Sequence, residues 1–221
     1  MRSLPVVFAV VAVGWLPACS SGGTHNKPLA RAAPTTTATS EPPSTAAPQS
    51  TCGPVPTSAK PGSGDVTPPG DIPDNQAFVA FASGDGRYSV KVPEGWGRTD
   101  QGAVTTFTDK LNTIRIELAP SAAAPSAASA AQELPALRAQ SRCFEGGTVS
   151  IVQRRAGPAV LTTYRADGAA DPVTGKVVHD DVERYEFWKA GNAAVITLSS
   201  PQGSDNVDPW RTVTDSFAWS S

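Results

Sequence analysis

The stretch of this chain that decides its fold is ERYEFWKAGNAAVITLSS, at residues 183–200. Apolar and polar residues alternate over 183–189 and again over 193–199, which is the period-two pattern of a β-strand with one buried face. Between the two runs, Ala190-Gly191-Asn192 has the composition of a tight turn. The stretch therefore predicts an antiparallel β-hairpin.

Other segments share this alternation and are predicted as strands: 77–81, 87–93, 104–108, 113–118, 148–153 and 159–165. A Gly-rich turn at 83–86 joins the first two of them into a second hairpin. In that hairpin, Tyr88, Val90 and Val92 alternate with polar residues and are expected to face the core.

A helix is predicted within 121–144, where alanine is frequent and Leu134 and Leu137 share one face. Pro135 removes a backbone donor and crowds the preceding turn. We therefore expect the helix either to kink at Pro135 or to begin there.

A second helix is predicted near the C-terminus. Asp208 is expected to cap it, with Pro209 in its first turn. Trp210, Val213 and Phe217 would then lie on one helical face that packs on the sheet. Several hairpins with two interspersed helices predict the α+β class, an antiparallel sheet packed with helices.

The N-terminal residues have the pattern of an export signal. Residues 4–13 form an apolar run behind Arg2 that is too short to span a bilayer. Leu16-Pro17-Ala18-Cys19 follows and resembles the bacterial lipoprotein box in its first, third and fourth residues. We predict a signal peptide at 1–18 and a lipid on Cys19 that anchors the exported chain to the outer face of the cell membrane. The alternative is an ordinary signal peptide with an incidental cysteine.

Composition divides the rest of the chain into two parts. Residues 19–72 consist mainly of Thr, Ser, Pro, Ala and Gly, and such a segment cannot bury enough apolar surface to offset the entropy of ordering. We predict a lipid-anchored, disordered stalk there. Over 73–221 aromatic and branched residues recur, and roughly 150 positions suffice for one α+β globular domain.

Two cysteines remain if Cys19 carries the lipid. Because exported proteins meet an oxidising environment, the simplest use of Cys52 and Cys143 is a disulfide. Such a bridge would hold the end of the stalk against the domain. Metal binding is the alternative, but neither cysteine lies in a C-x-x-C motif or near a histidine.

Charge and motifs argue against several function classes. A net charge of -2 without a Lys/Arg cluster is unlike a nucleic-acid-binding surface. The sequence also lacks a G-x-S-x-G nucleophile motif and the Gly-rich phosphate-binding motifs.

His179 is the one histidine of the predicted domain, and Asp180, Asp181 and Glu183 follow it closely. We expect a polar start of a strand there, with His179 and Asp180 on opposite faces, and we expect His179→Ala to affect folding and partner binding no more than an ordinary surface mutation does. A general base or a divalent-cation site at His179 is the alternative hypothesis.

Trp188 alternates out of phase with Tyr185 and Phe187, so both faces of the strand at 183–189 carry aromatic residues. Either the sheet is covered on both sides, or one face exposes an apolar surface. Because large aromatic side chains anchor many interfaces, Trp188 is our candidate partner-binding residue.

Several local strings resemble a known group of proteins. They are YSVKVPEGW at 88–96, AAVITLSSP at 193–201, DPW at 208–210 and FAW at 217–219. In their order they are similar to the Mog1/PsbP-like fold and, more narrowly, to actinobacterial cell-envelope lipoproteins of the LpqN type. The resemblance covers about 77–219 of this chain. It implies a binding or adaptor role and supplies no catalytic residue or cofactor.

We therefore expect a cell-envelope lipoprotein whose monomeric domain binds an envelope protein, glycan or lipid, without catalysis, cofactor or nucleic acid. One alternative is a hydrolase or metal-dependent enzyme centred on His179, which requires a polar pocket at that residue. Another is a carrier of apolar envelope ligands, which requires an enclosed cavity between sheet and helix.

Cys19→Ala tests the predicted anchor. Without the thiol no acyl chains are attached, so the protein should lose stable membrane association, which takes two lipid signals. Detergent-phase partitioning and the mass of the mature chain measure this outcome. Unchanged partitioning and mass would show that Cys19 carries no lipid.

Overall fold

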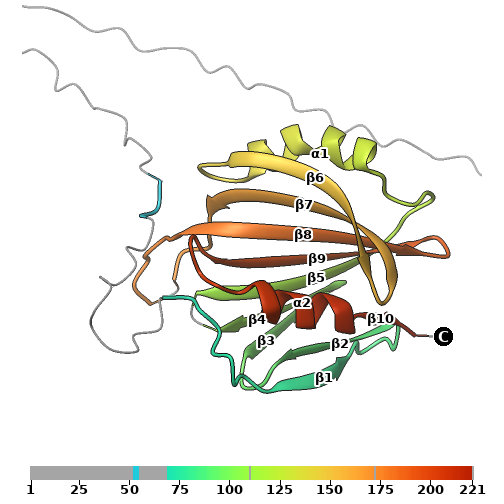
Figure 1. Cartoon of the computed structure of the whole chain (residues 1–221), viewed down its shortest axis with the longest axis horizontal. Helices are drawn as coiled ribbons and strands as arrows, with labels where there is room; N and C mark the ends of the chain where they lie inside the picture. Colours follow the sequence, from blue (N-terminus) through green and yellow to red (C-terminus); the bar gives the residue numbers. More distant parts are fainter. Residues whose placement is uncertain (1–51, 55–68, 110, 172, 221) are drawn as a thin grey trace, which may run out of the picture. The chain divides into compact units, whose positions relative to one another are not determined.

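The computed structural model describes residues 52–54, 69–109, 111–171 and 173–220. The predicted signal peptide, Cys19 and most of the predicted stalk lie outside these residues. The described elements, shown in Figure 1, are β1 (Phe78–Ala82), β2 (Tyr88–Pro93), β3 (Gly97–Gln101), β4 (Val104–Asp109), β5 (Asn112–Pro120), α1 (Ala127–Gln140), β6 (Glu145–Arg154), β7 (Gly157–Asp167), β8 (His179–Lys189), β9 (Asn192–Pro201), α2 (Val207–Ser216) and β10 (Ala218–Trp219). Neither of these helices is long and apolar enough to cross a membrane.

The predicted hairpin at 183–200 is confirmed and lies inside the larger of two sheets. Its strands β8 and β9 pair from Asp180 opposite Pro201 to Lys189 opposite Asn192. The seven strands of this sheet have the order β3-β4-β5-β9-β8-β7-β6. A smaller sheet has the order β1-β2-β10, and every pairing in both sheets is antiparallel. The predicted α+β class is confirmed.

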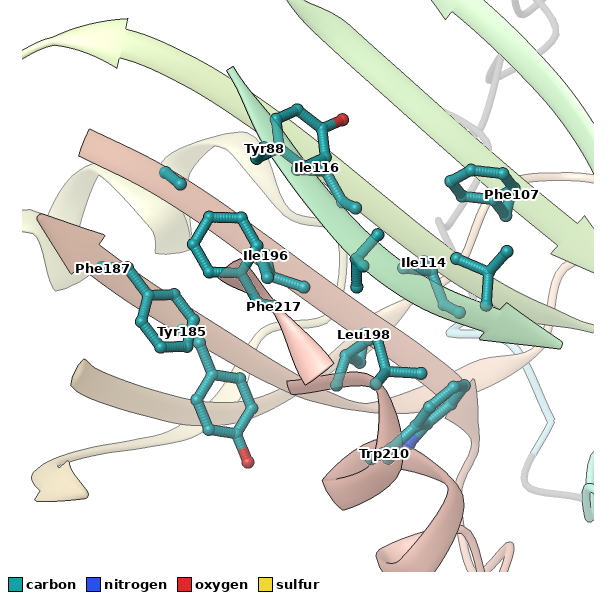
Figure 2. Packing of buried hydrophobic residues seen from close by; sticks show 14 of the residues in the cluster. Tyr88, Phe107, Ile114, Ile116, Tyr185, Phe187, Ile196, Leu198, Trp210 and Phe217 are labelled. Atoms are coloured by element: carbon teal, nitrogen blue, oxygen red, sulfur yellow. The ribbon is translucent and has the colours of Figure 1, made fainter. Parts of the chain in front are cut away.

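The core forms where α2 and the smaller sheet cover one face of the larger sheet. Ile114 lies opposite Leu198 and Ile116 opposite Ile196, and all four side chains are fully buried. Figure 2 shows them together with the aromatic rings of the same cluster, among them Trp210 of α2 and Phe217 just after it. Burying a large aliphatic side chain contributes about 1.5–3 kcal/mol, so this central cluster dominates the stability of the domain.

The inward residues of the first hairpin are placed as predicted. Tyr88, Val90 and Val92 are each less than 5% exposed and belong to the core. The Tyr88 ring lies 5.7 Å from that of Phe217, which links the smaller sheet to the end of α2. Burial raises the pKa of the Tyr88 hydroxyl.

Helix α1 lies against the opposite face, beside β6 and β7 (Figure 1). The prediction that it begins at Pro135 is wrong, because Ser126 caps it and its first residue is Ala127. Pro135 lies inside the helix, where it deprives the carbonyl of Ala131 of a donor. Ala131 is exposed, so water can satisfy that carbonyl.

Helix α2 begins one residue before the predicted cap and ends before Phe217. Asp208 lies in its first turn, while Asn206 occupies the cap position without capping the helix through its side chain. Trp210 and Val213 face the core as predicted. Phe217 is also buried, but it lies just past the last helical residue.

The side chain of Asn206 instead binds part of the predicted stalk. Its Oδ1 accepts from the backbone N–H of Ile72 at 2.8 Å, and its Nδ2 donates to the carbonyl of Gly70 at 2.8 Å. Ile72 is 5% exposed and belongs to the core cluster. The segment 69–72 therefore packs with the domain, ahead of the boundary predicted at 73.

A second part of the predicted stalk, residues 52–54, also contacts the domain, and we call it the strap. The predicted disulfide joins Cys52 to Cys143, with the Cα atoms 5.6 Å apart. The carbonyl of Pro54 accepts from the backbone N–H of His179 at 3.4 Å. A Cβ at Gly53 would lie 3.0 Å from the backbone of Val178, so the close approach of the strap favours glycine there.

The disulfide should contribute measurably to stability, because it closes a loop with a sequence separation of 91 residues. Removing such a bridge typically costs about 2–4 kcal/mol. We expect Cys52→Ala with Cys143→Ala to lower the free energy of unfolding by this amount in urea denaturation. Reduction with a dithiol should lower the wild-type value similarly and leave the double variant unchanged. Reactive thiols in the native, non-reduced protein would contradict the pairing.

Candidate functional site

Beyond the core, β7 and β8 carry three cross-strand pairs of polar and charged residues. Thr163 lies opposite Glu183, Arg165 opposite Asp181, and Asp167 opposite His179. Because the residues within each strand are two apart, all three pairs lie on the same face of the sheet. This face also carries Tyr185, so the core and the charged pairs occupy successive parts of one surface.

A groove with a volume of about 460 Å³ lies over these pairs, and we call it the acidic groove. The start of β6 and the start of α2 form its sides. The residues that give it its character are Glu145, Arg165, Asp181, Glu183, Asn206, Val207 and Trp210. Three carboxylates face one guanidinium, so the lining is acidic, and such a surface attracts cationic groups.

Two of the three carboxylates of the acidic groove, Asp181 and Glu183, are held in place by donors from the fold. Asp181 pairs with Arg165 at 2.8 Å and accepts from the backbone N–H of Gly203 at 3.1 Å. Glu183 accepts from the Tyr185 hydroxyl at 2.7 Å. Burial raises the pKa of Tyr185 to about 12, so its hydroxyl keeps the proton that it donates.

His179 is the first residue of β8, as the predicted polar start of a strand requires, but its side chain is buried and does not lie at the surface. The residue is 4% exposed, and its Nδ1 lies 3.2 Å from Oδ1 of Asp167. The same oxygen accepts from the backbone N–H of Gly53 at 2.9 Å, while Arg142 pairs with the other carboxylate oxygen at 3.3 Å. The strap thus covers a buried His179–Asp167 pair.

In the sequence, the acidic residues next to His179 were its candidate partners. Asp167, its partner in the structure, was not predicted. His179 and Asp180 are consecutive residues of β8, so their side chains point to opposite faces of the sheet, as expected. A usable signal was the alternation of charges at Arg165 and Asp167 and again at Asp181 and Glu183. The register of β7 against β8 determines that Arg165 lies opposite Asp181 and that Asp167 lies opposite His179.

The geometry gives His179 no access to a substrate. A general base must reach the proton that it removes, but Nε2 of His179 is buried and without a hydrogen-bond partner among the described residues. A carboxylate oxygen of Glu145 lies 3.9 Å from it, beyond hydrogen-bond distance. Within the described part of the chain, no three His, Cys, Asp or Glu side chains are grouped to hold a metal ion.

Trp188 lies on the other face of β8 and is partly buried. Its indole N–H donates to the carbonyl of Ser121 at 3.0 Å, just before α1. Beside it along the strand, Glu186 is buried and pairs with Arg184, which also reaches Glu133 of α1 at 3.3 Å. These contacts tie Trp188 into the fold, and its role in binding a partner stays a prediction.

The carrier hypothesis required room between sheet and helix. Under α2 that space is occupied by Trp210, Val213 and Phe217, each at most 4% exposed. Figure 2 shows the Trp210 and Phe217 rings filling it. The structure therefore offers no ligand chamber at this position.

Three solved structures share features of this fold. Cyanobacterial PsbP from Synechocystis sp. PCC 6803 matches with 15% identity and a TM-score of 0.47, over 68% of this chain and 98% of that one. The Ran-binding protein Mog1p of Saccharomyces cerevisiae matches with 10% identity and a TM-score of 0.43, over 65% and 95%. LpqN, involved in cell envelope biogenesis of Mycobacterium tuberculosis, matches with 15% identity and a TM-score of 0.41, over 67% and 93%.

A structure from Bacteroides thetaiotaomicron VPI-5482 also matches, with 15% identity and a TM-score of 0.44 over 64% of this chain, and this chain spans about half, 48%, of its length. No family model and no curated protein matches the chain. Likenesses at this level concern the fold and transfer no partner or activity.

The buried carboxyl of Asp180 should make stability depend on pH. Burial raises its pKa from 3.8 to about 7, partly offset by the charge of His179. The folded state therefore binds more protons than the unfolded state between these values, and this stabilising contribution is lost as the pH rises toward 7. The difference amounts to roughly 4 kcal/mol at most.

Asp180→Asn removes this titration. The difference in the free energy of unfolding between the variant and wild type should shift in favour of the variant from pH 5 to pH 8. Urea denaturation at both pH values measures this difference. Glu94→Gln removes a carboxylate from an exposed turn and serves as the control, with changes within about 0.5 kcal/mol at both pH values. A pH-independent difference between Asp180→Asn and wild type would contradict the assignment.

Proposed function

We propose that this chain is an exported lipoprotein of the LpqN type, anchored through Cys19, whose domain binds a partner at the acidic groove without catalysis. The lipoprotein-box residues Leu16, Ala18 and Cys19 support the anchor. The observation that supports binding is that Asp181 and Glu183 are held fixed in an open groove. Fixed charges need little reorganisation when a partner arrives, and this favours recognition.

The chemistry of the groove favours a protein segment rich in lysine or arginine. Carboxylates form charge-assisted, often bidentate hydrogen bonds with guanidinium groups. Glu145, whose side chain is 63% exposed, stands at the rim and is open to such a contact. Val207, 68% exposed at the start of α2, adds an apolar contact beside the charges.

Because the disulfide attaches Cys52 to the domain, the segment free to extend from the anchor ends at Cys52. About 33 residues then separate it from Cys19, and a fully extended chain of that length spans roughly 110 Å at most. A domain on such a tether can meet partners well above the membrane surface. This reach suits an adaptor that searches for a partner in the cell envelope.

In-cell photo-crosslinking tests the proposed function. A benzophenone amino acid at Val207 should give one adduct in the full-length protein, and mass spectrometry should find the crosslinked peptide rich in lysine or arginine. The same probe at Val173, which is 90% exposed outside the groove, serves as the matched control and should not give this adduct.

Charge-removing variants then test the role of the carboxylates. Glu145→Gln should reduce the Val207 adduct at least fivefold, whereas Glu117→Gln on β5 should leave it unchanged. An adduct that also forms at Val173, that ignores Glu145→Gln, or that contains only a glycan or lipid would overturn the proposal.

A further inference from the structure

A second groove, with a volume of about 920 Å³, runs along the exposed side of α2, and we call it the basic groove. Strand β2 forms one side, and the β6–β7 turn and the end of β8 contribute to its lining. None of its lining residues belongs to the acidic groove.

Positive charge predominates in this groove. Four cationic side chains and two acidic ones line it. The cations are Lys91 on β2, Arg155 at the β6–β7 turn, Lys189 at the end of β8, and Arg211 on α2. They come from four separate elements, so the charge is spread along the groove and does not converge on one point.

Most of this positive charge is not neutralised within the domain. Among the described residues, the side chains of Lys91, Arg155 and Lys189 make no ion pair. Asp215 is already shared between Arg211 at 3.5 Å and Arg154 at 3.8 Å. Three cations therefore remain for an outside ligand, against one carboxylate, Asp208, that forms no ion pair among the described residues.

The rest of the lining is apolar or carries hydroxyl groups. The partly buried Trp219 packs edge-on against Phe217, and Ala156 and Ala218 lie in the same lining. Ser89 and Thr212 contribute hydroxyl groups. Aromatic and small apolar groups accept the C–H face of a sugar ring, while hydroxyl groups bond the hydroxyls of a sugar.

We propose that the basic groove binds a linear glycan that carries carboxylate groups. Because the cations come from four separate elements along the groove, they favour a ligand whose negative charges are distributed along a chain over a single phosphate. A concave surface also suits a chain-like ligand better than a flat bilayer. This site is additional to the acidic groove and does not depend on the function proposed for it.

Isothermal titration calorimetry of the detergent-solubilised full chain with an oligogalacturonate of about ten sugars tests the proposal. Binding should weaken as salt rises, because the cations are solvent-exposed. The variant Lys91→Gln, Arg155→Gln, Lys189→Gln should bind at least tenfold more weakly. The matched control Arg98→Gln, Arg138→Gln, Lys176→Gln removes the same charge outside the groove and should change affinity less than twofold.

Companion ligands separate the rival sources of negative charge. Fully methyl-esterified oligogalacturonate should not bind, and Glu145→Gln should leave oligogalacturonate binding unchanged. Equal loss in both triple variants, or equal binding of the esterified glycan, would overturn the proposal. It would also be overturned if poly-L-glutamate or phosphatidylglycerol vesicles bound through the same three residues while oligogalacturonate did not.

Discussion

The antiparallel register of β8 against β7 and β9 is the constraint on which the rest of the structure depends. One face of β8 carries Tyr185 and Phe187 into the core and, farther along the same strand, Asp181 and Glu183 into the acidic groove. Because side chains alternate with a period of two, a slip by one residue would move the aromatic rings out of the core and turn the carboxylate of Glu186 toward the apolar core residues. The packing that fixes the register also positions the groove carboxylates, so binding geometry follows from core stability.

Much of the fold was predictable because it rests on local alternation, as in the hairpin at 183–200. Strand β3 was not predicted. All five of its residues are exposed, so its sequence shows no alternation of apolar and polar residues. Asn206 could be taken for a helix cap, but its side chain binds a segment 136 residues away. The sites were harder still: Asp167 meets His179 only through the register, and the basic groove draws its cations from four elements. Long-range pairing of this kind leaves no signal in a local window.

The buried carboxylate of Asp167 connects the attachment of the chain to the candidate site. A buried charge is costly unless hydrogen bonds and ion pairs offset its desolvation. Here the donors come from the strap at Gly53, from β8 at His179 and from Arg142 beside the disulfide. The carboxylate of Asp167 thus binds the strap. It also lies next to the Arg165–Asp181 pair along the two strands. For this reason His179 is better understood as a structural partner of Asp167 than as a base.

A net charge of -2 conceals a domain with two charged surfaces of opposite sign. The start of α2 borders the acidic groove at Val207, whereas its last residue, Ser216, accepts from the backbone of Lys91 in the basic groove. The ten residues of this helix span about 15 Å. At physiological ionic strength, charges are screened over about 8 Å. Each groove therefore presents its own field to an approaching molecule, and one helix separates a surface for cations from a surface for anions.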